Sequence, residues 1–238
     1  MYAKLGATVA IALAGVLAAC PAAALELDFG AAVQLLPPGT IVHMVVLDNG
    51  ASMTVTTEND GSGPDLAIVF DSADPTGGDV DLGTPNEDFG GPGKGNGGEE
   101  GEDGENADAL GHLFVIADNE IDDDGDGLVD VPEDEADGGM MRFDFSHEGY
   151  LSLTIIDVDE DEDEPVLRLY RSGALVGTVT GESLGNNSAQ HLDLTAYGEV
   201  DAVEIDMDGS HGIAEVVVNA INVGTEDTTW SGVKGEYR

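Results

Sequence analysis

Basic side chains are scarce in this sequence. Seven Lys and Arg residues stand against 49 Asp and Glu residues, which gives a formal net charge of -42 at pH 7. A phosphate backbone is bound through clustered Lys and Arg, so this composition excludes nucleic acid and argues against an anionic membrane surface. The same charge opposes compaction by self-repulsion, which divalent cations or high salt relieve. The sequence therefore indicates a saline or calcium-rich surrounding.

The chain has a single cysteine, and it lies in an N-terminal segment typical of an export signal. Lys4 supplies a basic start, residues 5–19 an apolar stretch, and Ala22–Ala24 a small-residue cleavage site. We therefore predict that residues 1–24 are a signal peptide and that the protein is secreted.

An alternative interpretation gives the cysteine a role. Leu17–Cys20 is similar to the lipobox of bacterial lipoproteins, in which lipidation of Cys20 would anchor the protein at the cell surface. Under either interpretation the mature chain has no disulfide, so its stability depends on the core, hydrogen bonds and bound metal.

Long apolar runs and helical periodicity are both absent after residue 24. A transmembrane helix needs about 18 or more apolar residues, and no later run approaches that length. Apolar residues instead alternate with polar ones, the period of a strand with one buried face. The strands expected on this pattern cover Leu25–Phe29, Ile41–Leu47, Ser52–Thr57, Leu66–Phe70, Leu113–Ala117, Met141–Phe145, Leu151–Val158, Val166–Arg171, Val203–Met207 and Ile213–Val223.

Turn residues separate these strands. Asp48–Gly50 and Arg171–Gly173 predict tight hairpins. Residues 86–109 are rich in Gly and Glu and predict a flexible or ion-ordered surface loop, while residues 159–164 are all acidic and predict a solvated tip. We therefore predict an all-β protein, a jelly-roll-like antiparallel β-sandwich.

The predicted organisation is one β-sandwich domain followed by a tail. Residues 25–224 form the domain, into which an EF-hand-like calcium loop is inserted at residues 118–139, and residues 225–238 form the C-terminal tail.

The inserted loop, Asp122–Glu133, matches a twelve-residue calcium loop. The acids at loop positions 1, 3, 5, 9 and 12 are Asp122, Asp124, Asp126, Asp130 and Glu133. Gly127 takes position 6, where the chain must turn, Leu128 offers its carbonyl at position 7, and Val129 can point inward at position 8. These residues predict a Ca²⁺ site, and the alternative is a solvated acidic turn.

The flanking segments of this loop read as strands rather than helices. Calcium at this position would therefore clamp two strands and order residues 118–139 instead of opening a helix pair. A second candidate site comprises Asp71, Asp74, Asp79 and Asp81, for which the alternative is Asp-based capping of turns.

Motifs of catalysis are missing. Nucleophile elbows, phosphate loops and dinucleotide fingerprints do not occur, and the five histidines form no spaced ligand pair. We therefore expect a non-catalytic protein. Aromatic residues make up only 5% of the chain, so the main candidate for stacking on a sugar is Trp230.

The order of segments resembles a group of secreted bacterial β-sandwich domains, found in exported proteins that end in a PEP-CTERM type sorting segment. Phe70–Pro85, Leu113–Ile116, the Asp-rich loop and Met141–Phe145 carry the resemblance, which covers most of residues 41–223. It implies an exported surface or matrix protein and no enzyme. The Pro-Glu-Pro motif, apolar helix and basic tail of the sorting segment are not found in Thr229–Arg238.

These observations predict an exported, calcium-stabilised, non-catalytic surface or matrix component. Its expected partners are calcium ions, together with extracellular polysaccharide or further copies of itself. The alternative is a carbohydrate-binding module, in which case Trp230 would contact the sugar, and a more distant one is a polysaccharide-active hydrolase.

Overall fold

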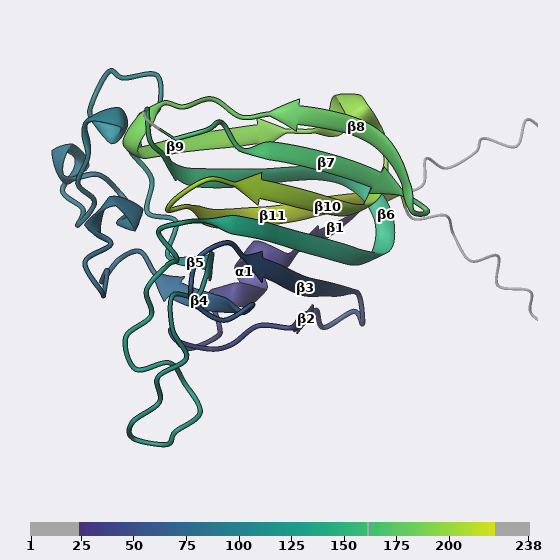
Figure 1. The fold of residues 1–238 in the computed structure, drawn as a ribbon. Coiled ribbons are helices and arrows are strands. Elements are labelled where there is room, and N and C mark those ends of the chain that lie inside the picture. The colour runs from purple at the N-terminus through teal and green to yellow at the C-terminus, as the bar shows by residue number, and fades with distance from the viewer. Residues whose placement is uncertain (1–23, 161, 222–238) are drawn as a thin grey trace, which may run out of the picture.

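The computed structural model describes residues 24–160 and 162–221 of the chain (Figure 1). The predictions for the signal peptide up to residue 23, for Cys20, and for the C-terminal tail with Trp230 lie outside these residues. Within them the chain is predominantly antiparallel β-sheet, so the predicted all-β class is confirmed.

The described residues form eleven strands, which are connected into one hydrogen-bonded sheet. They are β1 (Ala24–Asp28), β2 (Met44–Val46), β3 (Ser52–Asn59), β4 (Ala67–Asp71), β5 (His112–Ile116), β6 (Gly139–Val158), β7 (Val166–Arg171), β8 (Ala174–Thr180), β9 (Gly185–Asp193), β10 (Val200–Met207) and β11 (Gly212–Ile221). The helical elements in the same residues are short: α1 (Phe29–Val33), η1 (Val80–Leu82), η2 (Glu87–Phe89), η3 (Asn96–Gly98) and η4 (Thr195–Tyr197).

Strand β6 joins the two halves of this sheet. Its first part, up to Gly149, pairs with β3 and β10, and these lead on to β2 and to β7–β8. Its second part, from Tyr150, pairs with β9 and β11, and β11 leads on to β1 and to β5–β4. The sequence predicted two strands here. The structure has one strand of 20 residues, which changes partners midway.

Both halves bury their apolar faces in one cluster. Met53, Phe143 and Val203 enter it from the first half, and Phe114 and Ile213 enter it from the second. The rings of Phe114 and Phe143 meet edge to face across the two halves, with centroids 5.3 Å apart. Each such side chain stabilises the fold by about 1.5–3 kcal/mol when fully buried. A second, smaller cluster lies under the β4–β5 pair.

Both predicted hairpins are confirmed. The segment Asp48–Gly50 connects β2 to its antiparallel partner β3, and Arg171–Gly173 lies between the paired strands β7 and β8. Ser172 and Gly173 have φ values of 51° and 75°, the left-handed pair that a two-residue hairpin turn requires.

Helix α1 and strand β9 were not predicted from the sequence, and strand β8 was implied only by the predicted hairpin at Arg171–Gly173. Helix α1 follows β1 directly; Asp28 accepts a hydrogen bond from the Ala31 amide at 2.7 Å, and Phe29 and Val33 are buried. Strand β9 also went unrecognised. It pairs with the second part of β6 and brings Asn187 into the interior.

The Gly- and Glu-rich segment 86–109, for which the sequence predicted a flexible or ion-ordered surface loop, is held to the protein through two buried asparagines. Its Asn86 donates to the Oδ1 atom of Asn187 at 2.7 Å, and its Asn106 donates to the Asn187 carbonyl at 3.2 Å. Asn187 in turn donates to the Gly83 carbonyl at 2.7 Å. All three asparagines are buried, so a network of side-chain amides holds this segment against β9.

Arginines on the first half of the sheet are interleaved with acids. Arg142 forms ion pairs with Asp144 at 2.8 Å and with Glu204 at 3.5 Å, and Arg168 with Glu204 at 3.2 Å and Asp206 at 3.0 Å. This ladder crosses β6, β10 and β7. It neutralises the charge of acids on the sheet. The acids in the loops lie outside this ladder.

Candidate metal centre

The loop between β5 and β6 is closed at its base by backbone contacts. Ala117 forms an isolated antiparallel bridge with Asp134, and the Asp118 amide donates to the Glu133 carbonyl at 3.1 Å. The intervening residues project away from the sheet and form the teal loop at the bottom of Figure 1. We call residues 119–132 the tip of the loop, and its paired ends together with Asp79 the base.

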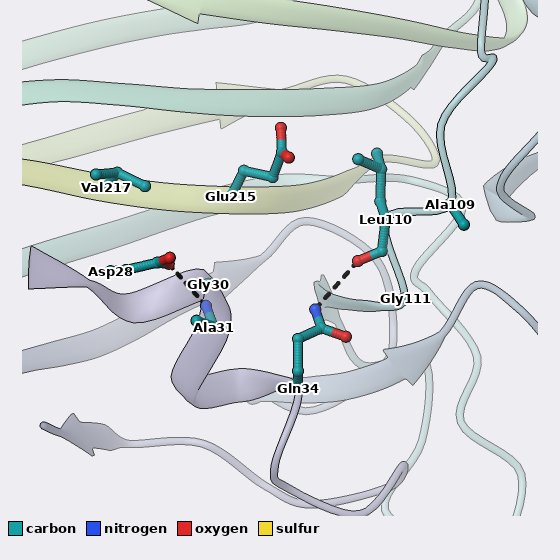
Figure 2. Close-up of a pocket in the computed structure, with 9 residues that line it drawn as sticks. All are labelled: Asp28, Gly30, Ala31, Gln34, Ala109, Leu110, Gly111, Glu215 and Val217. Atoms are coloured by element: carbon teal, nitrogen blue, oxygen red, sulfur yellow. Dashed lines mark hydrogen bonds between the residues drawn. The ribbon is translucent and has the colours of Figure 1, made fainter.

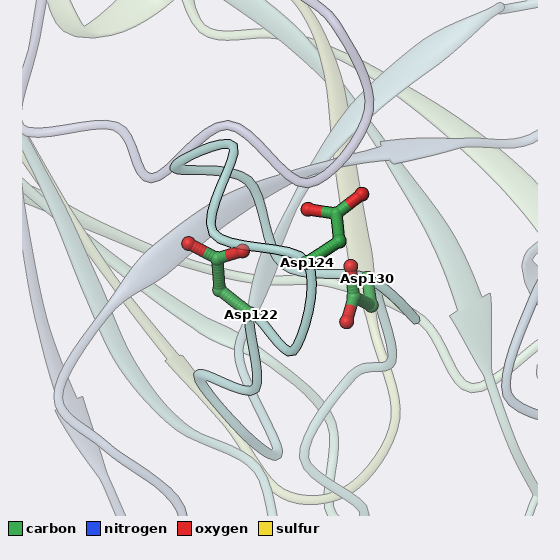
Figure 3. Close-up of side chains that lie close together, drawn as sticks. All are labelled: Asp122, Asp124 and Asp130. Atoms are coloured by element: carbon green, nitrogen blue, oxygen red, sulfur yellow. The ribbon is translucent and has the colours of Figure 1, made fainter.

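Three aspartates come together at the tip. Ligand oxygens of Asp122, Asp124 and Asp130 all lie within 4.8 Å of one another, and Figure 3 shows the three carboxylates around the same turn of the chain. It is the only group of three or more His, Cys, Asp or Glu side chains with this spacing in the described part of the chain. Exposed carboxylates at this separation can hold a metal ion.

Backbone amides organise the tip. The two carboxylate oxygens of Asp122 accept hydrogen bonds from the amides of Gly125 and Gly127 at 2.7 and 3.0 Å. Asp130 accepts from the Asp123 amide at 2.7 Å. Gly127 has a φ of 89°, a conformation that a residue with a Cβ rarely adopts. The sharp turn predicted at this position is therefore present.

Val129 anchors the tip to the protein, in agreement with its predicted inward direction. Its side chain is only 3% exposed and belongs to the smaller apolar cluster, with Ile68 and Phe70. Its amide donates to the Gly39 carbonyl at 2.9 Å. A Cβ at Gly39 would lie 2.3 Å from the Val129 carbonyl, so this close approach depends on glycine.

The other ligands predicted for the tip occupy different positions. Asp126 is exposed and its Oδ1 atom accepts from the Leu128 amide at 2.9 Å, so it caps the turn next to the cluster. Glu133 is directed toward the base: a Cβ at Gly77 would lie 2.7 Å from its Cγ atom. Partial burial raises the pKa of Glu133, and the charges of Asp79 and Asp118 raise it further. The structure therefore groups Glu133 with the acids of the base.

The base contains a buried carboxyl that the sequence did not single out. Asp134 is 6% exposed, and its Oδ2 atom is buried without a hydrogen-bond partner. Its amide donates to the Oδ2 atom of Asp79 at 3.1 Å. Burial raises the pKa of Asp134 to about 9, with the charge of Asp79 as the next cause, and burial also raises the pKa of Asp79.

The second predicted cluster is divided in the structure. Asp71 accepts from the Ala73 amide at 2.9 Å and so caps its own turn, and Asp74 is exposed. Asp81 accepts from the amide of the next residue at 3.1 Å, and burial raises its pKa. Asp79 and Asp81 both meet acids from other segments: the Asp134 amide donates to Asp79, and the charge of Asp81 acts on Asp134 and Asp157.

Asp157, near the end of β6, is a further buried acid that sequence reasoning missed. It is 2% exposed, has a φ of 68°, and accepts a hydrogen bond from the Asn187 amide at 2.5 Å. Burial raises the pKa of Asp157 to about 8, and the charge of Asp81 adds to the effect. Alternation along β6 gave no signal for it, because its neighbours on both sides are apolar and buried.

A cavity of about 340 Å³ lies between α1 and β11 (Figure 2). Asp28 and Glu215 give it an acidic lining, and Gln34 donates to the Leu110 carbonyl at 3.1 Å at its edge. None of the nine described residues that line it is aromatic. It therefore offers polar contacts and no surface for stacking a sugar ring.

The chain matches no known protein family in a scan of family models, and no curated protein matches its sequence. Within residues 24–160 and 162–221, no helix is long and apolar enough to cross a membrane.

Proposed function

We propose that this chain is an exported, non-catalytic β-protein whose compact form is stabilised by calcium. The observation that carries the proposal is the cluster of Asp122, Asp124 and Asp130 at the tip of the loop. Calcium binds six to eight hard oxygens at about 2.3–2.6 Å, and carboxylates presented from one tight turn, completed by backbone carbonyls and water, suit it. The Leu128 carbonyl belongs to this proposed set.

The role of the ion is structural. The tip lies between two strands and is anchored through Val129, so an ion here stabilises one position of the loop. A net charge of -42 supports the same interpretation, because each bound Ca²⁺ reduces the repulsion that opposes folding. Calcium-dependent self-association would follow from the same chemistry and would suit a component of a surface layer or matrix.

The proposed architecture is a β-sandwich with the two halves of the sheet as its layers. Its support is the shared core, in which Phe143 of one half meets Phe114 of the other. The jelly-roll order of strands stays a prediction, as does the likeness to secreted bacterial domains. Export follows from the N-terminal segment, with lipidation at Cys20 as the alternative route to the cell surface.

Removal of calcium is the direct test. At a Ca²⁺ concentration 100 times the Kd, the free energy of unfolding should rise by about 2.7 kcal/mol per site. We expect a higher melting temperature and slower proteolysis within residues 118–139 in Ca²⁺ than in chelator. Asp124→Asn should reduce both effects, while Asp74→Asn, which removes the same charge from an exposed position, should leave them. Equal melting and proteolysis with and without Ca²⁺ would rule the proposal out.

Carbohydrate binding is the competing function. Of the tyrosines in the described residues, Tyr170 lies under the Arg142 guanidinium at 4.9 Å and Tyr197 is 41% exposed. Binding to a glycan array that is lost in Trp230→Ala would favour this function. Hydrolysis of a polysaccharide, lost on substitution of a single acid, would favour the hydrolase.

A further inference from the structure

Strand β8 is a free edge of the sheet. Among the described residues it pairs with β7 only, and it lies at the outer edge of the first half, near the top of Figure 1. In the same part of the chain, no backbone hydrogen bond outside this ladder involves residues 174–180. Antiparallel strands direct their N–H and C=O groups alternately to opposite sides, so the outer side of β8 presents a row of these groups to solvent.

Tyr197 covers one face of β8 and leaves its edge open. A Cβ at Gly177 would lie 2.3 Å from the Cδ1 atom of Tyr197, so the ring packs where a side chain of residue 177 would stand. Side chains stand perpendicular to a sheet, whereas the hydrogen-bonding groups lie in its plane. Gly177 is paired with the fully buried Leu169, so Tyr197 closes the inner face.

The composition of β8 lacks most of the usual protections of an exposed edge. Proteins discourage edge-to-edge pairing with charged side chains, proline, very short edge strands or bulges. Strand β8 has seven residues, none of them charged and none of them proline, although 24% of the chain is charged. Leu175 and Val176 are 55% and 42% exposed. The one protection present is a bulge, which leaves Val176 without a partner in β7.

The charges near β8 favour the approach of a second copy at this edge. Two copies with a net charge of -42 repel each other over most of their surface. Residues 165–181, which include β7 and β8, contain two arginines and no acid. These arginines already pair with acids of the neighbouring elements, Arg168 with Glu204 at 3.2 Å and Arg171 with Glu199 at 3.1 Å. A second copy that approaches β8 therefore meets little uncompensated negative charge.

We propose that β8 is a contact between two copies of this chain, which pair antiparallel through residues 174–180 about a two-fold axis. In any antiparallel register of this segment with itself, uncharged residues oppose uncharged ones, and valine and threonine suit such cross-strand pairs. The first halves of the two copies then form one continuous sheet, and the contact closes after two copies. This dimer does not depend on the proposed calcium site.

Strand β2, the opposite edge of the first half, is the competing partner for β8. It is also uncharged, and its Met44 and Val46 are 56% and 60% exposed. Pairing of β8 with β2 of the next copy would be head to tail, so it would not close and would give filaments. Because β2 has three residues and β8 has seven, pairing of β8 with itself satisfies more of the exposed backbone groups.

Sedimentation equilibrium of the full chain tests the proposal, in chelator and in Ca²⁺, at low and at high NaCl. We expect a monomer–dimer equilibrium that NaCl shifts toward the dimer, because screening weakens the repulsion and the pairing contains no ion pair. Val176→Lys brings like charges of the two copies together and should weaken the dimer about tenfold or more. Thr178→Lys, at another exposed position of β8, should act in the same way. Val46→Lys adds the same charge to β2 and should leave the dimer unchanged.

Amide hydrogen exchange gives a second measurement that needs no substitution. Exchange in residues 174–180 of the parent should slow as the protein concentration rises, because the outer amides of β8 become hydrogen-bonded in the dimer. Slow exchange that does not depend on concentration would mean that another segment of the same chain covers β8, and the proposal would fail.

Three results of sedimentation would also overturn the proposal. The first is a parent that stays monomeric over the whole concentration series at high NaCl. The second is a set of larger oligomers that Val176→Lys and Val46→Lys weaken equally, which would assign the head-to-tail contact. The third is a dimer that forms only in Ca²⁺ and persists in both Val176→Lys and Thr178→Lys. If Ca²⁺ changes neither melting nor proteolysis, the proposed function fails, while the dimer through β8 is still decided by these variants.

Discussion

At the scale of single residues, a few buried acids set the pH response of the metal-free protein. Asp157 has a folded pKa of about 8 against an ordinary value of 3.8, and burial is the first cause. The folded state therefore binds this proton more strongly than the unfolded state. The resulting stability is complete below pH 4 and is lost as the pH rises from about 4 to about 8, by up to about 1.4 kcal/mol per pH unit.

Asp157→Asn should remove this dependence from one site. The amide oxygen can still accept from the Asn187 amide, and Asn tolerates the positive φ of 68°. In chelator at pH 8 we expect the variant to be more stable than the parent, with a shallower loss of stability between pH 5 and pH 8. Denaturant unfolding at several pH values measures both.

Other acids face Asp157, namely Asp81, Asp159 and Glu162, so some dependence on pH will persist in the variant. Asp108→Asn, at an exposed position, is the matched control and should keep the parent profile. If the free energy of unfolding falls with pH at the same slope in Asp157→Asn and in the parent, burial does not raise the pKa of this carboxyl.

Some residues of the site were predictable from the sequence and others were not. Asp122, Asp124 and Asp130 are recognisable because one loop supplies them at fixed spacing, and the structure brings them together. Asp134 and Asp79 are 55 positions apart and meet through the hydrogen bond from the Asp134 amide to the Asp79 carboxylate. Glu133 fits the template by position, yet its side chain lies against Gly77 in the connection that carries Asp79. The spacing of residues along the chain does not predict contacts between residues that are far apart in the sequence.

At the scale of elements, Val129 links the tip to the core. Val129→Ala should lower the free energy of unfolding by roughly 1–3 kcal/mol, because it removes buried methyl groups from a closed cluster. It should also weaken Ca²⁺ binding at the tip, since the loop loses its anchor. Val131→Ala removes the same atoms from a neighbour that is 47% exposed and should have little effect on either quantity.

Calorimetric titration with Ca²⁺ and denaturant unfolding of both variants provide the comparison. Equal effects of the two substitutions would show that the tip is held by its backbone alone, through the hydrogen bond from the Val129 amide to Gly39.

The strands illustrate why some elements were predictable and others were not. Alternation identified most of them, because residues such as Leu151, Leu153 and Ile155 share a buried face. Residues 146–148 interrupt the pattern with exposed polar side chains, so β6 read as two strands. Strand β9 is rich in Asn, Gln and Ser, and it is buried by a polar loop instead of an apolar sheet. The pattern of apolar and polar residues therefore gave no indication of this strand.

At the scale of the whole molecule, the excess of negative charge controls the response to salt. Screening shortens the Debye length from about 10 Å at 0.1 M to about 3 Å at 1 M. In chelator, the melting temperature should therefore rise between 0.05 M and 1 M NaCl, by about 2–4 °C for each kcal/mol of relieved repulsion. In Ca²⁺ the rise should be smaller, because bound ions already offset part of the charge of -42.

Thermal scans over a series of NaCl concentrations, with and without Ca²⁺, measure this difference. Tetramethylammonium chloride in place of NaCl would exclude specific binding of sodium. Identical salt dependence in chelator and in Ca²⁺ would mean that cations do not occupy the acidic loops of the folded protein.

The shared strand β6 has one more consequence. Since Gly139–Val158 gives hydrogen bonds to partners in both halves, neither half can detach without breaking ladders in the other. The two halves of the described sheet therefore cannot be separated between strands. Fragments expressed to either side of Gly149 should each expose unpaired strand edges and precipitate, and mechanical or thermal disruption should proceed in a single step.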